Sequence, residues 1–212
     1  MGRIYDATWG RLFSAAYDRG FKATEEAGLR EMRRDLLAQA RGRVLELGAG
    51  TGLNLEHYPE GIEALTLVEP DPHMTKQLRP KLARSGREAE VVEAPAERLP
   101  FAADSFDTAV VTLVLCTVPD QEGALGELAR VLKPDGQLLF LEHVRAHSPE
   151  LAKWQDRLER PWRFLGDGCH CNRDTETAIG AAGFELGEVK RGELPKAPPI
   201  VKPLARGSAR IA

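Results

Sequence analysis

Residues 44–52 read VLELGAGTG, and this stretch decides the fold class of the chain. Its first half is apolar apart from Glu46 and fits a strand that is covered on both faces of a parallel sheet. Its second half carries glycines at alternate positions, Gly48, Gly50 and Gly52. Glycine has no Cβ, so the chain can turn sharply there and bring bare backbone close to a ligand. The stretch predicts a strand that runs into a ligand-binding turn.

A second apolar run, residues 65–68, ends in an acid, Glu69. In nucleotide-binding half-domains an acid at the end of the neighbouring strand accepts hydrogen bonds from ribose hydroxyls. The order strand, glycine turn, helix, strand and acid therefore predicts a half-domain that binds a nucleoside.

Strand and helix patterns alternate along the following residues. We expect five strands, at 43–47, 65–69, 90–94, 106–118 and 138–144, with helices at 7–40, 72–84 and 125–132. Lys133–Gly136 reads as a turn before the fifth strand. After Ser148 we expect an apolar helical stripe up to Leu165, a turn-rich stretch, a helix at 175–182 and two strands, at 184–192 and 200–211. The repeats imply a parallel sheet that binds ligands at the carboxyl ends of its strands.

The composition is that of an ordinary globular protein, with 212 residues, 42% hydrophobic and 29% charged. We expect a single domain, 1–212, in which residues 1–42 form a helical cover, 43–147 a cofactor-binding core, and 148–212 acceptor-side helices and C-terminal strands. The net charge of −3 argues against a nucleic-acid partner. The oligomeric state is left open.

The compartment and the relation to membranes follow from two further features. The three cysteines, Cys116, Cys169 and Cys171, are too few for a disulfide framework, so we expect a cytoplasmic protein. No apolar run approaches 18 residues, which predicts that the chain has no membrane span. Residues 190–212 carry six basic residues and one acid, so peripheral contact with a membrane or an anionic substrate stays open beside a plain solvated face.

Three nucleoside ligands compete for the glycine turn. ATP or GTP is disfavoured because no Gly-Lys-Ser/Thr follows the glycines. A dinucleotide needs Gly-x-Gly-x-x-Gly, whereas this chain has Gly-x-Gly-x-Gly. Glu46 would also repel a pyrophosphate, but a carboxylate there suits a cationic ligand. A nicotinamide-dependent reductase remains as a weak alternative.

The chain resembles the class I S-adenosylmethionine-dependent methyltransferases. VLELGAGTG is similar to their first motif, LVEPD to their second, and APAERLPF to their third, although Pro95-Ala96-Glu97 replaces the commoner Gly-Asp-Ala. FDTAVVTLVLCTV, followed by VLKPDG, is similar to the region from the fourth strand to the turn before the fifth. The resemblance implies a doubly wound, seven-stranded, mostly parallel Rossmann-like sheet in the order 3-2-1-4-5-7-6, with the last strand antiparallel and a helical N-terminal cover.

The resemblance also implies a set of cofactor contacts. Glu46 would help to bind the amino end of S-adenosylmethionine, and Glu69 would accept both ribose hydroxyls. Backbone in the glycine turn would lie beside the methionine portion, and the end of the fourth strand under the sulfonium. The remaining expected cofactor residues are Gly48, Ala49, Gly50, Thr51, Gly52, Pro70, Met74, Ala96, Glu97, Thr112 and Leu113. Met74 as a core residue and Glu97 as a solvated or helix-capping residue are the structural alternatives. S-adenosylhomocysteine would be the product, and no metal is expected.

The second half of the chain gives a closer resemblance. TLVLCTV, LEHV, the Trp-rich helix and GDGC are similar to the methyltransferase-like seven family, which methylates small alkyl thiols. A thiol is therefore the first expected acceptor. A quinone ring carbon, a phospholipid amine and a cofactor-binding protein without turnover are the alternatives. The family's N-terminal membrane anchor is replaced here by an amphipathic beginning, and His170-Cys171-Asn172 departs from its Leu-Thr type pair.

Acceptor-side residues are predicted from their places near the expected strand ends. His143 would face the acceptor and help to deprotonate it, because an imidazole titrates near the working pH. A structural, hydrogen-bonded histidine is the alternative. Trp162, Asp167, His170 and Arg173 are the candidate acceptor-binding residues, with a plain turn and helix cap as the alternative for the last three. The rings of Trp154, Trp162 and Phe164 would roof the pocket or pack on the sheet. A zinc site at Cys169-His170-Cys171 is disfavoured, because it lacks the C-x-x-C spacing. Cys116 is expected to be a small core residue.

Overall fold

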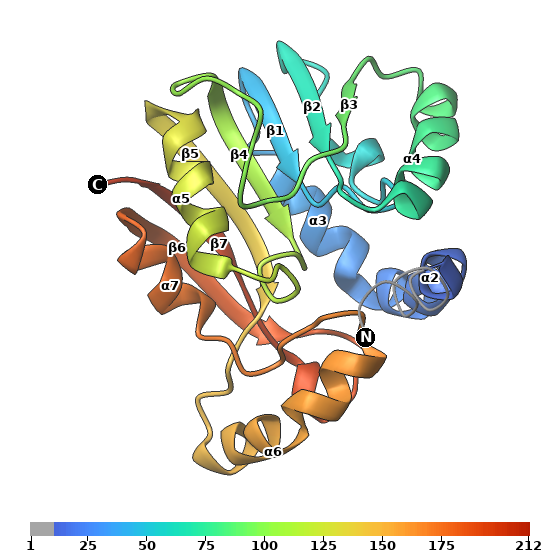
Figure 1. The fold of residues 1–212 in the computed structure, drawn as a ribbon, viewed down its shortest axis with the longest axis vertical. Helices are drawn as coiled ribbons and strands as arrows, with labels where there is room; N and C mark the ends of the chain where they lie inside the picture. Colours follow the sequence, from blue (N-terminus) through green and yellow to red (C-terminus); the bar gives the residue numbers. More distant parts are fainter. Residues whose placement is uncertain (1–10) are drawn as a thin grey trace.

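A single seven-stranded sheet organises the computed structural model, which describes residues 11–212, with side chains from residue 16 onward (Figure 1). The strand order is β3-β2-β1-β4-β5-β7-β6, and β7 runs antiparallel to both β5 and β6. The strands are β1 (Arg43–Leu47), β2 (Ala64–Val68), β3 (Glu90–Val92), β4 (Phe106–Thr112), β5 (Leu132–His143), β6 (Phe184–Glu193) and β7 (Pro203–Ile211). The predicted fold class and strand order are confirmed.

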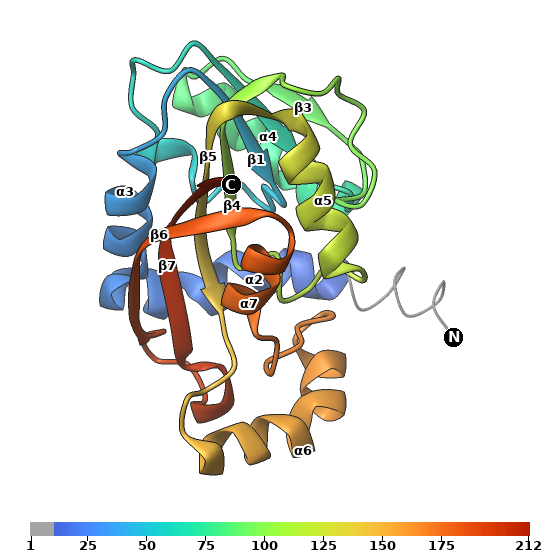
Figure 2. The ribbon, with the colours of Figure 1, turned by 90° about the vertical axis from the view of Figure 1, so that its left-hand side faces the viewer.

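Helices lie on both faces of the sheet (Figures 1 and 2). They are α2 (Arg11–Thr24), a π-helical segment (Glu25–Leu29), α3 (Arg30–Leu37), α4 (Pro72–Ser85), α5 (Gln121–Val131), α6 (Pro149–Leu165) and α7 (Thr175–Ala181), with 3-10 turns at Leu55–His57 and Pro199–Val201. Four of the helices begin at a residue whose side chain accepts a backbone N–H of the first turn, namely Asp71, Asp120, Ser148 and Asp174. Such caps satisfy amide groups that the helix itself leaves unpaired.

Alternate residues of the central strands fill two separate cores. Leu45 and Phe140 pack on the face covered by α5 and α7, while Val44 and Leu139 pack on the face covered by α3 and α4. Side chains of a strand point alternately to opposite faces, so near-continuous apolar runs are needed to bury both faces. This double burial fixes the register and holds the carboxyl ends of β1, β2, β4 and β5 side by side.

The N-terminal helix predicted over 7–40 is interrupted. Residues 7–10 of the predicted helix lie outside the described part. Gly28 has a φ of 134°, which breaks the helix between α2 and α3. Leu29 and Leu36 are buried in the core between α3 and the sheet, so α3 packs through an apolar face. The break sets α2 at an angle to α3 and across the carboxyl edge of the sheet (Figure 1).

Two predicted strand boundaries are wrong. The fourth strand ends at Thr112 rather than at 118, because Leu113 adopts a positive φ of 60° and the following chain turns. The fifth strand begins at Leu132 rather than at 138, since Leu132 already pairs with Phe106. The pairing then shifts register before Thr108 and Gln137, so residues 133–136, predicted as a turn, form an irregularity within β5.

Among residues 11–212, no helix combines the length and the apolar character that crossing a membrane requires.

Candidate active site

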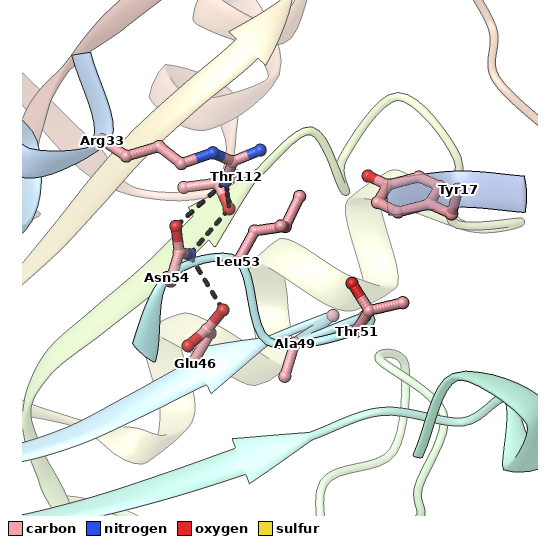
Figure 3. A pocket seen from close by; sticks show the side chains of 10 residues that line it. Tyr17, Arg33, Glu46, Ala49, Thr51, Leu53, Asn54 and Thr112 are labelled. Atoms are coloured by element: carbon pink, nitrogen blue, oxygen red, sulfur yellow. Dashed lines mark hydrogen bonds between the residues drawn. The ribbon is translucent and has the colours of Figure 1, made fainter. Parts of the chain in front are cut away.

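A cavity with an empty volume of about 250 Å³ lies at the carboxyl end of β1, partly open to solvent (Figure 3). Its lining combines the glycine turn with residues from α2, α3 and β4: Tyr17, Arg33, Glu46, Gly48, Ala49, Gly50, Thr51, Leu53, Asn54 and Thr112. Six of these were predicted as cofactor residues. This is the position at which doubly wound sheets bind their ligands.

Glu46 is the acid at the bottom of this cavity. Its Oε1 accepts a hydrogen bond from Asn54 Nδ2 at 2.8 Å, and its Oε2 accepts one from the Tyr58 hydroxyl at 2.7 Å. Burial raises the pKa of the carboxyl to about 7, although both hydrogen bonds and nearby Arg33 oppose the rise. The free protein therefore holds Glu46 close to half ionised at neutral pH, and a cation in the cavity would favour the charged form.

A buried arginine, which the sequence analysis did not identify, ties α3 to this acid. Arg33 Nη1 donates to Asn54 Oδ1 at 3.0 Å and to Thr112 Oγ1 at 2.9 Å, while its Nε donates to Glu25 at 3.0 Å. Figure 3 shows the chain of contacts from Arg33 through Asn54 to Glu46. Arg33 lies four residues after buried Leu29, so its place on the apolar face of α3 was the available sign.

Glu69 lies at the end of β2 and faces the same turn. Its Oε2 accepts the N–H of Gly50 at 2.8 Å, and its Oε1 accepts the N–H of Asp71 at 2.9 Å. Burial raises its pKa, while the two backbone donors act in the opposite direction. The carboxylate thus stands beside the glycine turn, and the lone pairs left after these two bonds are available to ligand hydroxyls.

The residues expected at the adenine lie outside the cavity lining: Pro70 follows β2, Met74 is in the first turn of α4, and Ala96 and Glu97 are in the loop after β3. Met74 and Ala96 are buried and Pro70 is exposed. Glu97 is partly buried, and its carboxylate accepts the N–H of Asp120, the residue that caps α5. In this structure Glu97 therefore orders the start of α5, and its predicted contact with adenine stays a prediction.

The turn after β4 packs closely against the glycine turn. A Cβ built on Gly48, whose φ is 68°, would lie 2.4 Å from Cγ2 of Val114, so this position has room only for glycine. Leu113 takes a positive φ at the same place, which is uncommon for a residue with a branched side chain. The Glu142 carboxylate holds the turn by accepting the N–H groups of Val114 and Leu115. The sulfonium is thus expected where the turns after β1 and β4 pack closely against each other, and this close packing requires glycine at position 48.

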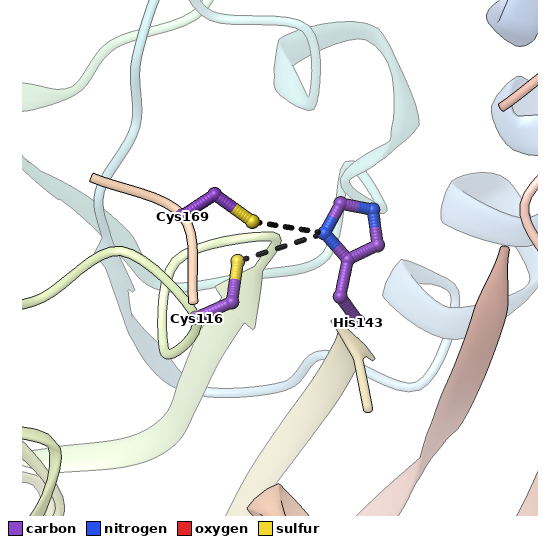
Figure 4. A group of neighbouring side chains, drawn as sticks. All are labelled: Cys116, His143 and Cys169. Carbon is purple, nitrogen blue, oxygen red and sulfur yellow. Dashed lines mark hydrogen bonds between the residues drawn. The ribbon is translucent and has the colours of Figure 1, made fainter. Parts of the chain in front are cut away.

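His143 ends β5 and contacts two thiols (Figure 4). Its Nδ1 lies 3.7 Å from Cys116 Sγ and 3.6 Å from Cys169 Sγ. Hydrogen bonding between the two thiols lowers the pKa of Cys169 and raises that of Cys116, so the pair favours a single thiolate on Cys169. Cys116 is buried as predicted, but it belongs to this polar group rather than to a purely apolar environment.

The predicted acceptor-binding residues lie on the loop after α6, which packs against the turn after β4. Arg173 Nη1 donates to the carbonyl oxygens of Leu115 and Val118, at 2.6 and 2.8 Å. His170 donates its backbone N–H to Cys116 O at 2.7 Å, and its ring pairs with Glu159 at 2.8 Å. Asp167 is close enough to influence the pKa of Glu69. Arg173 and His170 therefore hold two loops together in this structure, and their contact with an acceptor stays a prediction.

The aromatic side chains of α6 do not enclose the cavity. Trp154 is 53% exposed and Phe164 is 58% exposed, so the predicted close packing of these two rings on the sheet is wrong, and their place over an acceptor stays a prediction. Trp162 lies near Cys169, because a Cβ built on Gly166 would lie 3.1 Å from Trp162 Nε1 and 3.3 Å from Cys169 Cβ. Cys171 Sγ contacts the carbonyl oxygen of Gln155 and lies outside the group around His143.

Comparison with known proteins indicates the same class of protein as the arrangement of side chains at these strand ends. A family model described as a methyltransferase domain matches residues 45–140. The human thiol S-methyltransferase TMT1B is 37% identical over 171 residues, which cover 75% of this chain and 70% of the relative. The rat thiol S-methyltransferase TMT1B is 41% identical over 145 residues, and there the match spans 66% of this chain and 59% of the relative's length.

Solved structures show a similar fold. A Thermotoga maritima protein described as an S-adenosylmethionine-dependent methyltransferase, possible histamine N-methyltransferase, superposes with a TM-score of 0.67 at 24% identity. That match covers 95% of this chain and 98% of the other.

Proposed function

Because the chain belongs to the family of S-adenosylmethionine-dependent methyltransferases that includes the thiol S-methyltransferase TMT1B, we propose that it transfers the methyl group of S-adenosylmethionine to a small thiol. The observation that carries the proposal is the pair of acids, Glu46 and Glu69, which flank one glycine turn at adjacent strand ends. One acid suits the ammonium of the cofactor and the other its ribose.

The chemistry asks little of the protein beyond alignment. Positive sulfur already activates the methyl group, so an acceptor that is held in line gains up to about 7–11 kcal/mol from positioning. A thiol must also lose its proton, since a free thiol has a pKa of about 8.5. His143 is the group that we assign to assist this deprotonation, because it ends β5 next to the turn that follows β4.

The cofactor side follows from the same placement. Gly48, Ala49, Gly50 and Thr51 would contact the methionine portion through their backbone, and Thr112 and Leu113 would lie under the sulfonium. S-adenosylhomocysteine would then leave as the product. We also propose a cytoplasmic location, since the three free cysteines of the chain suit a reducing compartment.

A panel of acceptors that differ in one atom tests the acceptor class. The purified protein is incubated with S-adenosylmethionine and either butanethiol, butanol or butylamine, and release of S-adenosylhomocysteine is measured beside the mass of the methylated product. We expect turnover with the thiol alone. The variant Glu69→Ala serves as the control for background release. Equal turnover of the amine, or methylation of a quinone or phosphatidylethanolamine instead of the thiol, would refute the assignment.

The role of His143 is tested in the same assay. His143→Ala should lower the turnover of butanethiol, and the loss should shrink as the pH is raised and more of the thiol ionises in solution. Unchanged turnover between pH 7 and 9 would remove His143 from the reaction.

A further inference from the structure

Three side chains from separate parts of the chain converge near the proposed site. Cys116 lies in the turn after β4, His143 ends β5, and Cys169 lies in the loop after α6 (Figure 4). All three are buried, and Sγ, Nδ1 and Sγ lie within 4.8 Å of one another. Sequence spacing gave no indication of this group, because 53 residues separate the two cysteines that it brings together.

Hydrogen bonds of the surrounding residues hold together the two loops that carry Cys116 and Cys169, and His143 is held by the pairing of β5 with β7, where it lies opposite Leu204. His170 donates its N–H to Cys116 O, so the residue next to Cys169 is bonded to Cys116 itself. Arg173 ties the same loop to the carbonyl oxygens of Leu115 and Val118 on either side. The donor atoms are therefore held by surrounding structure, as a metal site requires.

The distances fit a tetrahedral zinc ion. With Zn–S of about 2.3 Å, Zn–N of about 2.05 Å and tetrahedral angles, ligand sulfur and nitrogen lie about 3.6 Å apart. The two observed separations are 3.6 and 3.7 Å. We propose that Cys116, His143 and Cys169 bind a zinc ion through Sγ, Nδ1 and Sγ, and that the acceptor thiol binds at the fourth position. This replaces the sequence-based expectation that no metal is bound.

Charge balance supports the same assignment. A divalent cation with two thiolates and a neutral imidazole is neutral overall, which suits a buried position. An acceptor thiolate then adds one negative charge, and the sulfonium of the cofactor carries one positive charge. Cys116 lies two residues after Val114, whose side chain packs against Gly48 of the cofactor cavity. The cluster therefore lies near the cavity in which the sulfonium is expected.

The proposed step rests on the proposed function and specifies how His143 would help. The acceptor thiol gives its proton to solvent when it binds as a thiolate. Its sulfur lone pair then forms a bond to the methyl carbon as the bond from that carbon to the sulfonium breaks. The products are a neutral thioether and S-adenosylhomocysteine. A thioether binds zinc less strongly than a thiolate does, so the product can leave.

Metal analysis of matched cysteine variants tests the site. The protein is purified without chelator, and zinc per chain is measured by mass spectrometry. Cys116→Ser and Cys169→Ser remove one ligand each, whereas Cys171→Ser changes a buried thiol that contacts Gln155 O instead. We expect about one zinc per chain in the unchanged protein and in Cys171→Ser, and at least a tenfold weaker zinc affinity in the other two.

Cobalt provides a readout that does not depend on activity. Co²⁺ in the unchanged protein should give the intense visible bands of a tetrahedral thiolate site, and butanethiol should shift them while butanol should not. The absence of stoichiometric zinc and cobalt binding, equal losses in all three variants, or a Cys116–Cys169 disulfide in freshly purified protein would overturn the proposal.

The two proposals fail differently. Thiol methylation without bound metal would overturn the zinc site and leave the proposed function standing. Stoichiometric zinc without methylation of any thiol would overturn the acceptor class, and with it the fourth-ligand role, but not the metal site. The far-ultraviolet circular dichroism spectra of Cys116→Ser, Cys169→Ser and Cys171→Ser should match that of the unchanged protein, which shows that each variant is folded.

Discussion

Binding of S-adenosylmethionine should depend on pH through Glu46, and Glu46→Gln should remove that dependence. Burial raises the pKa of this carboxyl to about 7 in the free protein. The ammonium of the cofactor would lower this pKa in the complex, because a nearby opposite charge favours the ionised form. Binding then selects the ionised fraction, which is about one-tenth at pH 6 and nine-tenths at pH 8.

The expected magnitude follows from these fractions. The Kd for S-adenosylmethionine should fall about tenfold between pH 6 and pH 8. Glu46→Gln should bind more weakly at pH 8 and show less than a threefold change over this range. Isothermal titration calorimetry in two buffers with different ionisation enthalpies should also show about half a proton released per cofactor at pH 7 by the unchanged protein, and none by the variant.

Glu142 provides the control, because its pKa is also raised to about 7 by burial. It holds the N–H groups of Val114 and Leu115 and does not line the cavity. Glu142→Gln should keep the tenfold change. A pH-independent Kd in the unchanged protein, or the same loss of pH dependence in both variants, would show that Glu46 does not carry the proton.

Stability should follow the same pKa. The pKa of Glu46 is about 7 in the folded protein and 4.5 in the unfolded chain, so between these values the folded state binds more protons. The contribution of Glu46 to stability is therefore fully present below pH 4.5 and is lost as the pH rises through 7. Between pH 5 and pH 8, Glu46→Gln should therefore lessen the fall in the free energy of unfolding by about 2–3 kcal/mol, measured by urea denaturation without cofactor. A fall that is equally steep in the variant would contradict this pKa.

Three further predictions concern the architecture of the site, each tested with a matched second substitution. Glu69→Ala should weaken S-adenosylmethionine binding at least tenfold, measured by calorimetry, whereas Glu93→Ala, at an exposed acid just beyond β3, should leave the Kd unchanged. Gly48→Ala should lower the melting temperature far more than Gly50→Ala, since both residues have positive φ but only the Cβ at 48 would meet Val114; equal shifts would exclude the clash as the cause. Arg33→Met should cost about 3–5 kcal/mol by leaving Glu25 buried and unpaired, and adding Glu25→Gln should recover part of that loss in urea denaturation.

Local patterns predicted much of the fold and part of the site. The apolar runs around Leu45 and Val110 identified central parallel strands, because burial on both faces requires continuous apolar sequence. Glycines with positive φ at 48, 50 and 52 confirm the predicted turn. Glu69, which follows its apolar run directly, lies beside that turn as the sequence order implied.

Errors arose where a distant contact overrides local preference. The apolar run after Thr112 reads as a continuing strand, but Glu142 on β5 accepts its N–H groups and the chain turns. Arg33 reads as a surface residue of a helix, yet three polar partners from other elements hold its guanidinium inside the protein. Apart from the place of Arg33 on the apolar face of α3, the neighbouring residues give no sign of either contact.

The sequence by itself determined most of the elements and the edge at which a nucleoside would bind, because those properties depend on periodicity and on residues close together in the chain. The strand order was implied by the resemblance to class I methyltransferases. Only the tertiary structure decided which side chains meet at that edge. Arg33 donates to Thr112, which lies 79 positions later in the sequence. Cys116, His143 and Cys169 lie together although they come from the turn after β4, the end of β5 and the loop after α6. Such contacts depend on how the crossover connections return the chain to the sheet. The number of residues between two positions does not indicate how far apart their side chains lie in the fold.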